Sequence, residues 1–323
     1  MKHRVLIIGC GNIAGGLDFN HNHSNRLPLT HAKAYKKNHN FELVACIDSN
    51  EEQLLGFQKE WSISQGFLSI EEAISKKIEI DVVSICSPTH CREEHLNLVL
   101  SLNPRLVFCE KPIHFDISAA KNLIQKYKEK NVYLQVNYNR RFDHSVCDFK
   151  KSIESKEFGD LRVIRGWYNK GLLNNGSHCL DMLNFLFGRL IIKNVGEGIN
   201  DYDKNDLSYP LHLSTRNNIP IFLSCGNAND FSLVELEFLF ANGRIKMLNG
   251  GRNWSFERVT EDSTFRGYKI LGDVEFTDGK YLESFSNAVS NIHNCLIKNE
   301  KLKSNGKDAL KVLSLCSEIL EKT

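Results

Sequence analysis

The 323-residue chain contains no apolar run that approaches the roughly 18 residues of a membrane-spanning helix. After the basic start Met-Lys-His-Arg, only four apolar residues precede Gly9, too few for the core of a signal peptide. Ten cysteines are present without any C-x-x-C pair, so their spacing indicates neither a zinc site nor a redox motif. Cys46, Cys86 and Cys109 lie inside apolar, strand-like runs. We therefore expect a cytoplasmic protein with buried, reduced thiols rather than disulfides.

A strong excess of one charge is also missing. The net charge is +2 at pH 7 and no long basic run occurs, which argues against a nucleic-acid partner. Internal repeats, low-complexity segments and a Pro-rich linker are absent too. The hydrophobic content of 41% and charged content of 25% are ordinary for a globular protein. The length allows two domains with large cores.

A glycine motif near the start of the chain predicts a dinucleotide-binding turn. Residues 5–8 form a short apolar run with β-branched members, which predicts a buried parallel strand. Gly9, Gly11 and Ala14 follow as G-x-G-x-x-A, the turn that places a pyrophosphate at a helix N-terminus. An ordinary strand-turn-helix without a ligand is the alternative. The predicted cofactor contacts in this turn are Gly9, Gly11, Asn12, Ile13 and Ala14.

The second predicted strand, residues 41–47, ends at Asp48. An acidic residue here usually binds the adenosine ribose hydroxyls, and no Arg follows to bind a 2′-phosphate, so NAD is favoured over NADP. The alternative role for Asp48 is to cap the next helix. Asp48 lies 37 residues after Gly11, whereas about 20 is usual. We assign the excess to a loop inserted after the first helical turn.

The inserted loop covers residues 17–29, and the helix is predicted to resume near Thr30. Its Arg26, His21 and His23 are candidates to contact an anionic part of a substrate, such as a nucleotide diphosphate. A surface loop or a subunit contact is the alternative. His21, His23 and His31 could suggest a metal, but the neighbours of the first two are Asn and Ser and no thiolate is close, so no metal site is predicted.

Strands alternate with helices over residues 4–136, which predicts a doubly wound parallel sheet and a dinucleotide-binding domain at residues 1–136. Ligands bind beyond the carboxyl ends of such strands. Ser87-Pro88, Glu110-Lys111-Pro112 and Asn137 fall at those ends. Residues 137–323 are predicted to form a second, α+β domain with a large, mostly antiparallel sheet. Its expected strands are residues 161–168, 191–198, 209–215, 219–226, 231–240, 243–248 and 266–271, with helices at 146–156, 176–187, 281–298 and 307–322.

The chain resembles the glucose–fructose oxidoreductase, inositol dehydrogenase and MocA (Gfo/Idh/MocA) family over nearly its whole length. The motifs that carry the resemblance are Gly9–Ala14, Ser87-Pro88-Thr89 with His95, Cys109-Glu110-Lys111-Pro112, Asn139–Phe142, and Asn174-x-Gly176-x-His178-x-x-Asp181. The resemblance implies a Rossmann domain, a second domain with an open sheet, and a homodimer or homotetramer formed through that sheet. It also implies a nicotinamide over Glu110-Lys111-Pro112, a cis Lys111–Pro112 bond, and substrate between the domains.

Lys111 and His178 are the candidate catalytic residues. Lys111 can give or take the proton of the reacting hydroxyl, and the positive charge of an oxidised nicotinamide would favour its base form. His178 would hydrogen-bond the same hydroxyl. Members of the family often carry Asp four residues before this His; here Asn174 stands there, so no carboxylate at that position supports a His178 cation. The alternatives are a surface Lys before a turn and a structural His at a helix start.

Other polar residues are assigned to binding. Glu110 is expected to orient Lys111 or a backbone group, and Pro112 to rigidify the turn. Asp181 either binds substrate or caps its helix, and Arg141 either binds an anionic group or forms an interdomain salt bridge. The candidate cofactor contacts outside the glycine turn are Asp48, Ser87, Pro88, Glu110 and Lys111. The candidate substrate contacts are Asn137, Arg141, Tyr168, Lys170, Asn174 and Asp181.

The resemblance implies an NAD-dependent oxidoreductase that transfers a hydride between nicotinamide and a sugar or nucleotide-sugar carbon. Residues 168–178 look like family members associated with surface-polysaccharide pathways. One alternative is a redox-neutral epimerase or glycosidase with tightly bound NAD. Another is a non-catalytic NAD-binding regulator, against which the presence of both Lys111 and His178 argues.

Overall fold

The computed structural model describes residues 2–20 and 26–323, so the predicted contacts of His21 and His23 lie outside the described residues. The chain divides into two compact units. The first contains residues 1–142 and 282–313, and the second contains residues 143–281 and 314–323. The domain boundary at residue 136 is placed where the strand–helix alternation of the sequence ends, and it stays a prediction. None of the helices in residues 2–20 and 26–323 has the length and apolarity that a membrane crossing requires.

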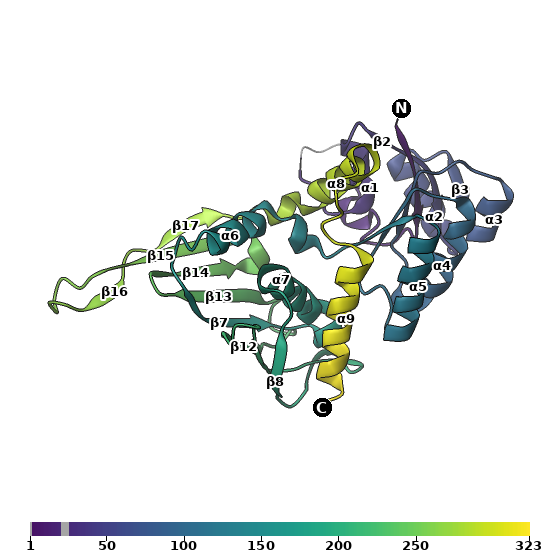
Figure 1. The fold of residues 1–323 in the computed structure, drawn as a ribbon. Coiled ribbons are helices and arrows are strands. Elements are labelled where there is room, and N and C mark those ends of the chain that lie inside the picture. Colours follow the sequence, from purple (N-terminus) through teal and green to yellow (C-terminus); the bar gives the residue numbers. More distant parts are fainter. Residues whose placement is uncertain (1, 21–25) are drawn as a thin grey trace. The chain divides into compact units, whose positions relative to one another are not determined.

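The first unit is built on a six-stranded parallel sheet with the order β3-β2-β1-β4-β5-β6 (Figure 1). The order reverses between β1 and β4, which is where ligands bind in doubly wound folds. The strands are β1 (His3–Ile8), β2 (Phe41–Ile47), β3 (Gln65–Phe67), β4 (Val82–Ile85), β5 (Leu106–Cys109) and β6 (Tyr133–Val136). The helices are α1 (His31–Lys37), α2 (Glu51–Trp61), α3 (Ile70–Ser75), α4 (Arg92–Leu98), α5 (Ile117–Glu129) and α8 (Ser284–Lys298). The doubly wound prediction is confirmed.

The core of this unit explains why its strands were readable in the sequence. Residues 5–8 of β1 are at most 1% exposed, because helices cover both faces of the sheet. Phe57 and Trp61 of α2 are fully buried in the same core. Phe285 and Ile292 of α8 join them, so residues 282–313 complete the core of a unit whose other residues end at Phe142.

The first helix is interrupted and then resumes in register. The N–H of His31 donates to the Ile13 carbonyl at 3.2 Å, and the N–H of Ala32 donates to the Ala14 carbonyl at 2.8 Å. Helix α1 therefore stacks directly on the turn of the glycine motif. Thr30 caps α1 by accepting from the N–H of Lys33. The prediction that the helix resumes near Thr30 is confirmed.

A buried carboxylate joins the two ends of this insertion. Asp18, in the short 3₁₀ turn Gly16–Asp18, accepts from the N–H of Leu29 at 2.9 Å and from Thr30 Oγ1 at 2.8 Å. Its other oxygen lies 3.4 Å from the buried Lys33 ammonium. Because an unpaired buried charge is costly, this pairing fixes where the insertion leaves and rejoins the helix.

The second unit is built on a nine-stranded sheet with the order β16-β15-β14-β13-β7-β12-β11-β8, with β17 beside β15. Strands β7 and β12 are parallel and the other pairs antiparallel, as predicted for a mostly antiparallel sheet. The strands are β7 (Leu161–Tyr168), β8 (Ile191–Val195), β11 (Leu211–Ser214), β12 (Pro220–Cys225), β13 (Val234–Phe240), β14 (Gly243–Leu248), β15 (Asn253–Glu261), β16 (Lys269–Leu271) and β17 (Glu275–Asp278). A separate hairpin pairs β9 (Ile199–Asp203) with β10 (Asp206–Ser208).

One face of the nine-stranded sheet is covered by α6 (His144–Glu154) and α7 (Ser177–Phe187) (Figure 1). Phe149 of α6 meets Phe238 of β13 with ring centroids 4.6 Å apart. The opposite face carries paired charges, such as Arg244 and Glu257, whose Nε and Oε2 atoms are 2.7 Å apart. Helix α9 (Gly306–Leu320) ends the chain.

Candidate active site

The two glycines of the turn serve different purposes: Gly9 fits where a side chain would clash, and Gly11 leaves its backbone open. Gly9 has φ +83°, and a Cβ there would lie 2.8 Å from the backbone nitrogen of Ser87. Only glycine satisfies both constraints. At Gly11 an added Cβ would meet nothing closer than Gln53 Nε2 at 3.6 Å. The open side of Gly11 therefore leaves room for a ligand to approach the backbone.

A cavity of about 730 Å³ opens at this turn, where β1, β2 and β4 end. It is large enough for a substantial part of a dinucleotide. The structure brings together in its lining Gly9, Gly11, Asp48, Ser87 and Pro88 of the predicted cofactor contacts. Asn12, Ile13 and Ala14 are not among the lining residues, and Ala14 is fully buried beneath the turn.

Asp48 supports the glycine turn as well as lining the cavity. Its Oδ2 accepts from the N–H of Cys10 at 2.8 Å, and its Oδ1 accepts from the N–H of Asn50 at 2.9 Å. Asn50, rather than Asp48, caps helix α2. An ionised carboxylate accepts about four hydrogen bonds, so Asp48 retains capacity for two ligand hydroxyls.

Glu110 is the centre of a buried polar network at the end of β5. Its Oε1 accepts from Asn137 Nδ2 at 2.6 Å and lies 2.9 Å from His31 Nε2, while its Oε2 accepts from the N–H of Lys111 at 3.3 Å. Burial favours a raised pKa for Glu110, but the hydrogen bonds from His31 and Asn137 and the nearby Arg92 charge outweigh it and leave the pKa lowered. Glu110 is thus a buried carboxylate that stays ionised.

The network continues behind His31. His31 Nδ1 lies 3.3 Å from Ser84 Oγ, and the Tyr35 hydroxyl lies 2.9 Å from the same oxygen. Burial raises the pKa of Tyr35, so Tyr35 stays protonated and can donate. Tyr35 can therefore donate to Ser84, while His31 Nε2 donates to Glu110.

Arg92 connects the ends of β4 and β5. It donates to the Ser87 carbonyl at 3.1 Å and to Thr89 Oγ1 at 3.0 Å, and it also donates to the Pro112 carbonyl. The Lys111–Pro112 peptide is cis, as the resemblance implied. Arg92 therefore holds the predicted catalytic turn against a strand end that lines the cavity.

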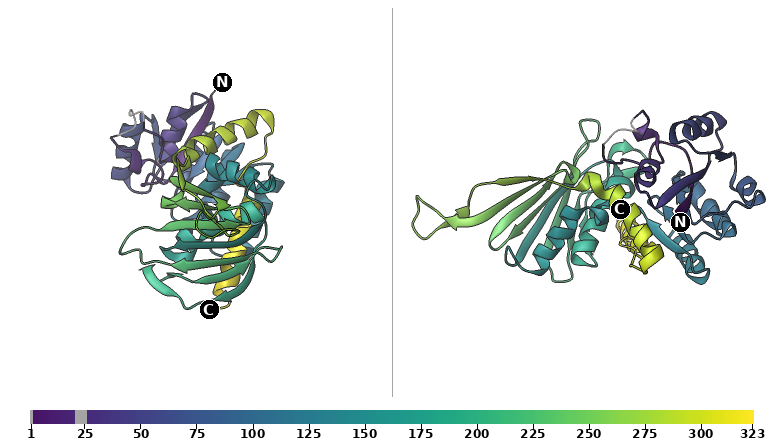
Figure 2. Two further views of the ribbon diagram at one scale, coloured as in Figure 1. Left: turned by 90° about the vertical axis from the view of Figure 1, so that its left-hand side faces the viewer. Right: turned by 90° about the horizontal axis from the view of Figure 1, so that it is seen from above.

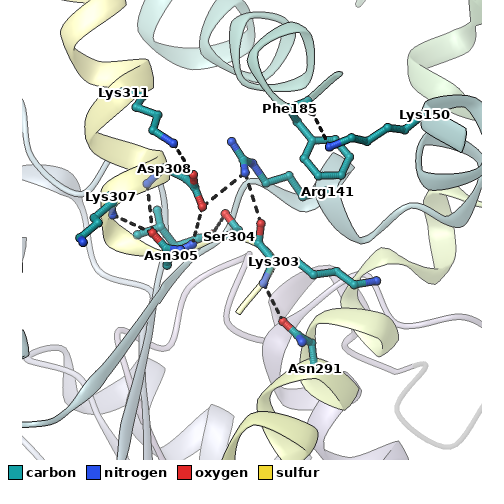
Figure 3. A network of polar contacts seen from close by, with 11 residues as sticks. Arg141, Lys150, Phe185, Asn291, Lys303, Ser304, Asn305, Lys307, Asp308 and Lys311 are labelled. Carbon is teal, nitrogen blue, oxygen red and sulfur yellow. Dashed lines mark hydrogen bonds and ion pairs between the residues drawn. The ribbon is translucent and has the colours of Figure 1, made fainter. Parts of the chain in front are cut away.

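Arg141 makes two polar contacts within its own unit (Figure 3). Its guanidinium lies 3.4 Å from an Asp308 carboxylate oxygen and donates to the Lys303 carbonyl at 3.3 Å. Ser304 donates from its hydroxyl to the Val136 carbonyl at 2.6 Å, so residues 303–308 are held along β6. The interaction is a salt bridge within the first unit; a substrate role for Arg141 stays a prediction.

In the second unit, Tyr168 and Lys170 occupy different settings. Tyr168 is fully buried and its hydroxyl donates to the Tyr209 carbonyl at 2.8 Å. Lys170 has a left-handed backbone, and its ammonium lies 5.7 Å from the centre of the Tyr202 ring. The geometry therefore gives Tyr168 a structural bond, while Lys170 presents its charge beside β9.

The turn that leads to His178 is held by the β9–β10 hairpin. Gly171–Gly176 forms a π-helical turn, and Asp206 accepts from the N–H of Leu173 at 2.8 Å and from the N–H of Asn174 at 2.9 Å. Asp201 accepts from the N–H of Lys170 at 2.8 Å. A Cβ at Gly171 would lie 2.2 Å from Asp206 Oδ2. The carboxylates and the turn are therefore fitted closely to each other.

His178 and Asp181 lie on the first turns of α7, which begins at Ser177. His178 is half-buried, and Asp181 is only 1% exposed. The predicted helix is confirmed, and both residues share one unit with Asn174. Their catalytic and binding roles stay predictions.

Sequence reasoning missed several members of these networks: His31, Ser84, Arg92, Asp201 and Asp206. His31 begins the resumed helix, where its only sequence signal was its place after Thr30. Asp201 and Asp206 lie more than twenty residues from the turn they hold, in a polar stretch without a strand pattern. Their spacing to His178 carries no recognisable period.

Comparisons with known proteins give a consistent result. A model of an oxidoreductase family with an NAD-binding Rossmann fold, GFO_IDH_MocA, matches residues 3–138. Inositol 2-dehydrogenase from Rhizobium meliloti (strain 1021) is 25% identical over 322 residues, covering 90% of this chain and 92% of that protein.

Solved structures share the fold over the whole chain. A mutant 3-ketoreductase from Actinomadura kijaniata, in complex with TDP-benzene and NADP, matches with a TM-score of 0.80 at 16% identity, covering 100% of this chain and 98% of that chain. WlbA dehydrogenase from Bordetella pertussis, in complex with NADH and UDP-GlcNAcA, matches with a TM-score of 0.78 at 16% identity, covering 99% of this chain and 95% of that chain.

The first prediction concerns Glu110. Because its folded-state pKa lies below the ordinary 4.5, the unfolded chain binds the proton more readily. The stability that Glu110 contributes is then present above about pH 4.5 and is lost as the pH falls toward the folded pKa. Replacing Glu110→Gln should lower the free energy of unfolding by about 2 kcal/mol near neutral pH. In urea titrations the difference in free energy of unfolding between wild type and Glu110→Gln should shrink as the pH falls below about 4.5, because Gln carries no titrating charge. The exposed Glu42→Gln is the control, and an equal gap at all pH values would contradict the prediction.

The second prediction concerns the hairpin clamp. Asp206→Asn replaces one accepting oxygen with a donor, so one of the bonds to the Leu173 and Asn174 amides is lost. Deuterium exchange of the 170–176 segment should accelerate about tenfold, as expected for the loss of one charge-assisted hydrogen bond. Asp203→Asn, on the same hairpin but bonded only to Asn205, is the matched control. Unchanged exchange in Asp206→Asn would show that the hairpin does not hold this turn.

Proposed function

Because this chain belongs to the Gfo/Idh/MocA family and is an NAD(P)-dependent oxidoreductase acting on CH–OH groups, we propose that it uses NAD to interconvert a hydroxyl and a ketone on a sugar or nucleotide sugar. One observation carries this proposal. The open glycine turn follows β1 and the Glu110-Lys111-Pro112 turn follows β5, with only β4 between them in the sheet, and Arg92 ties the end of β4 to the turn after β5.

The residues present fit a dinucleotide. Gly11 leaves its backbone accessible, and Asp48 keeps two accepting positions beside it. Asn137 adds a third feature: it is 3% exposed, and its Oδ1 finds no hydrogen-bond partner within the described residues. A buried acceptor of this kind is expected to receive a donor from a ligand. We assign it to the carboxamide of the nicotinamide or to a substrate hydroxyl.

The charges of the cavity support NAD over NADP. Arg92 is the single Lys or Arg side chain among the cavity-lining residues that the structure describes, and it is already bonded to Ser87, Thr89 and Pro112. Asp48 places a carboxylate where a 2′-phosphate would need a cation. The family includes both cofactor types, so the preference rests on these residues.

A bound nicotinamide would supply or accept the hydride. Lys111 gives its proton to the substrate oxygen during reduction and takes one during oxidation. Its main chain is fixed because Glu110 holds its N–H and Arg92 holds the Pro112 carbonyl beyond it. His178 positions the same hydroxyl by hydrogen bonding, since Asn174 offers no carboxylate to stabilise an imidazolium.

Nucleotide sugars are the substrate class we favour. Two proteins of the same fold were solved with nucleotide-linked ligands, TDP-benzene and UDP-GlcNAcA. Lys170, beside β9, and Arg26, in the insertion, are the cations we assign to the diphosphate. A role in surface-polysaccharide sugar synthesis follows from the likeness of residues 168–178. Inositol, the substrate of the relative from Rhizobium meliloti, is the polyol to compare in the same assay.

Two further functions stay open to the same fold. A redox-neutral epimerase or glycosidase would keep its NAD through dialysis and show no net NADH change. A non-catalytic regulator would bind NAD without turnover of any sugar. Identifying the small molecule that co-purifies, together with NADH fluorescence, distinguishes the three functions.

The third prediction tests cofactor choice. NAD(H) should bind more tightly than NADP(H) in calorimetric titrations, because Asp48 binds ribose hydroxyls and repels a 2′-phosphate. Asp48→Ala should lower the affinity for both cofactors, because the Cys10 N–H loses its acceptor. It should also bring the affinities for NAD(H) and NADP(H) closer together. Ser49→Ala, which changes the cavity wall without removing a charge, should leave the ratio of the two affinities unchanged. Equal affinities in the wild type would defeat the assignment.

The fourth prediction tests the proton transfer. Positioned acid–base groups contribute about 10²–10⁴-fold in rate, so Lys111→Met should lower kcat by that factor with NADH affinity nearly intact. His178→Asn keeps a hydrogen-bonding side chain and should cost less. Asn174→Asp should raise the pKa of His178, because an anion favours the imidazolium.

Three outcomes are informative. If His178→Asn is far more damaging than Lys111→Met, and Asn174→Asp shifts the acid limb of the pH–rate profile, then His178 is the principal acid. If both variants are harmless with a substrate that turns over, the assigned site is wrong. If NADH binds but no sugar turns over in the wild type, the regulator becomes the better proposal.

A further inference from the structure

A two-stranded arm leaves the large sheet at one edge. Strand β15 pairs with β14 only as far as Arg258; residues 259–261 pair with β16, apart from one bond from the N–H of Val259 to the Asn242 carbonyl. We call residues 259–271 the arm. Figures 1 and 2 show it projecting beyond the other strands of its sheet. A ribbon of two strands has little stability in water without further packing.

The arm exposes large apolar side chains instead of burying them. Phe265 is 63% exposed, Tyr268 69% and Ile270 46%. The rings of Phe265 and Tyr268 lie together at the tip, with centroids 6.1 Å apart. Exposed apolar side chains gathered on an unpaired strand edge are typical of an interaction site.

A ring-lined groove lies at the base of the same arm. Its volume is about 380 Å³, and it runs between α6 and the edge strands β15 and β17. Phe149, Trp254 and Phe256 supply aromatic walls. Trp254 is 2% exposed, and its indole N–H has no acceptor within the described residues. The groove therefore offers apolar surface and one unsatisfied donor.

The groove and the apolar residues of the arm lie on one face. Trp254, Phe256, Arg258 and Thr260 alternate along β15, so they share a face, and Thr260 pairs with Ile270. By the same alternation Tyr268 lies on the side of Ile270. This face is the helix-covered one, opposite to the face with Arg244 and Glu257. It is thus distinct from the open face through which the family resemblance implies assembly.

We propose that the arm of one copy lies in the groove of a second copy, and the reverse, about a two-fold axis. From Phe256 to Glu261 the strand spans roughly 17 Å, and the turn carries Phe265 beyond it, so an axis through the middle of the arm brings each tip over the other's base. Because groove and tip share a face, one surface is complementary to itself, which is what a two-fold interface requires. The hydroxyl of Tyr268 then supplies an acceptor for Trp254.

The charges favour a second copy as the occupant. Three carboxylates line the groove, and two of them are paired within the chain, Asp148 with Lys151 and Glu157 with Arg258, which leaves Glu275. The arm carries Arg266 at its tip, and Lys269 opposite Glu261 on the neighbouring strand. Its Asp262 is used within the tip, where it accepts from the amides of Thr264 and Phe265. A groove with one carboxylate outside these pairs thus meets a tip with one cation, Arg266, that has no carboxylate opposite it on the neighbouring strand.

The first experiment measures self-association by sedimentation velocity over a concentration series. The full-length wild type should associate, and the double variant Phe265→Ser with Tyr268→Ser should weaken association at least tenfold with an unchanged melting temperature, because neither ring is buried in one copy. Phe231→Ser, which is 64% exposed outside the arm, is the matched control. Phe222→Ser removes a 41% exposed ring from the open face.

The second experiment tests the contact itself. One preparation carries Tyr268→Cys and another carries Thr277→Cys, at the groove. Mild oxidation of the mixture should give a disulfide between positions 268 and 277 in peptide mass mapping, and neither preparation alone should give it. Tyr268→Cys mixed with Phe222→Cys is the control for random collision.

The outcomes separate this inference from its rivals. A monomeric wild type overturns it. Association that is sensitive to Phe222→Ser and insensitive to the tip variant overturns it in favour of the open face. Loss of association in the tip variant without the 268–277 disulfide shows that the tip meets another surface, and overturns the groove as its partner.

Discussion

The structure around the candidate site depends on keeping one buried carboxylate satisfied. Glu110 is fully enclosed yet ionised, and a charge in that position is tolerated only when several donors surround it. His31, Asn137 and the N–H of Lys111 supply them. Each donor comes from a different segment: the start of α1, the end of β6 and the turn after β5. The carboxylate therefore fixes three elements at the strand ends where a ligand binds.

This requirement explains how the chain accommodates an insertion at a demanding place. Interrupting the helix beside the phosphate-binding turn would misplace His31 if the helix restarted elsewhere. The bonds from His31 and Ala32 back to Ile13 and Ala14 restore the helical register, and Asp18 clamps the two ends of the excursion. Loop closure costs grow slowly with length, so the excursion adds little penalty once its ends are fixed.

The first unit was largely readable in the sequence because its strands are buried on both faces. Such strands read as short apolar runs, and the residues that follow them fall at one edge of the sheet by topology alone. The resumption of the helix near Thr30 followed from the change to a regular pattern. What the sequence could not give was the partner of Glu110, because His31 is 79 residues away and its contact depends on how α1 lies against β5.

The second unit was less readable, for a different physical reason. Strand β9 is exposed at every residue except Asp201, and β10 is only three residues long, so no apolar alternation marks either strand. Strand β15 alternates only as far as Phe256; beyond Arg258 it leaves the sheet and has no core to face within its own chain.

Both departures from the expected pattern carry a role in the structure. The polar hairpin places Asp201 and Asp206 against the turn before α7, where backbone donors need acceptors. The arm exposes apolar rings to solvent, and no other part of the same copy that the structure describes buries them. A segment can lack the pattern of a buried strand or helix and still carry side chains that need a polar or apolar partner. Such a segment is informative, because the partner must then lie in another segment or on another molecule.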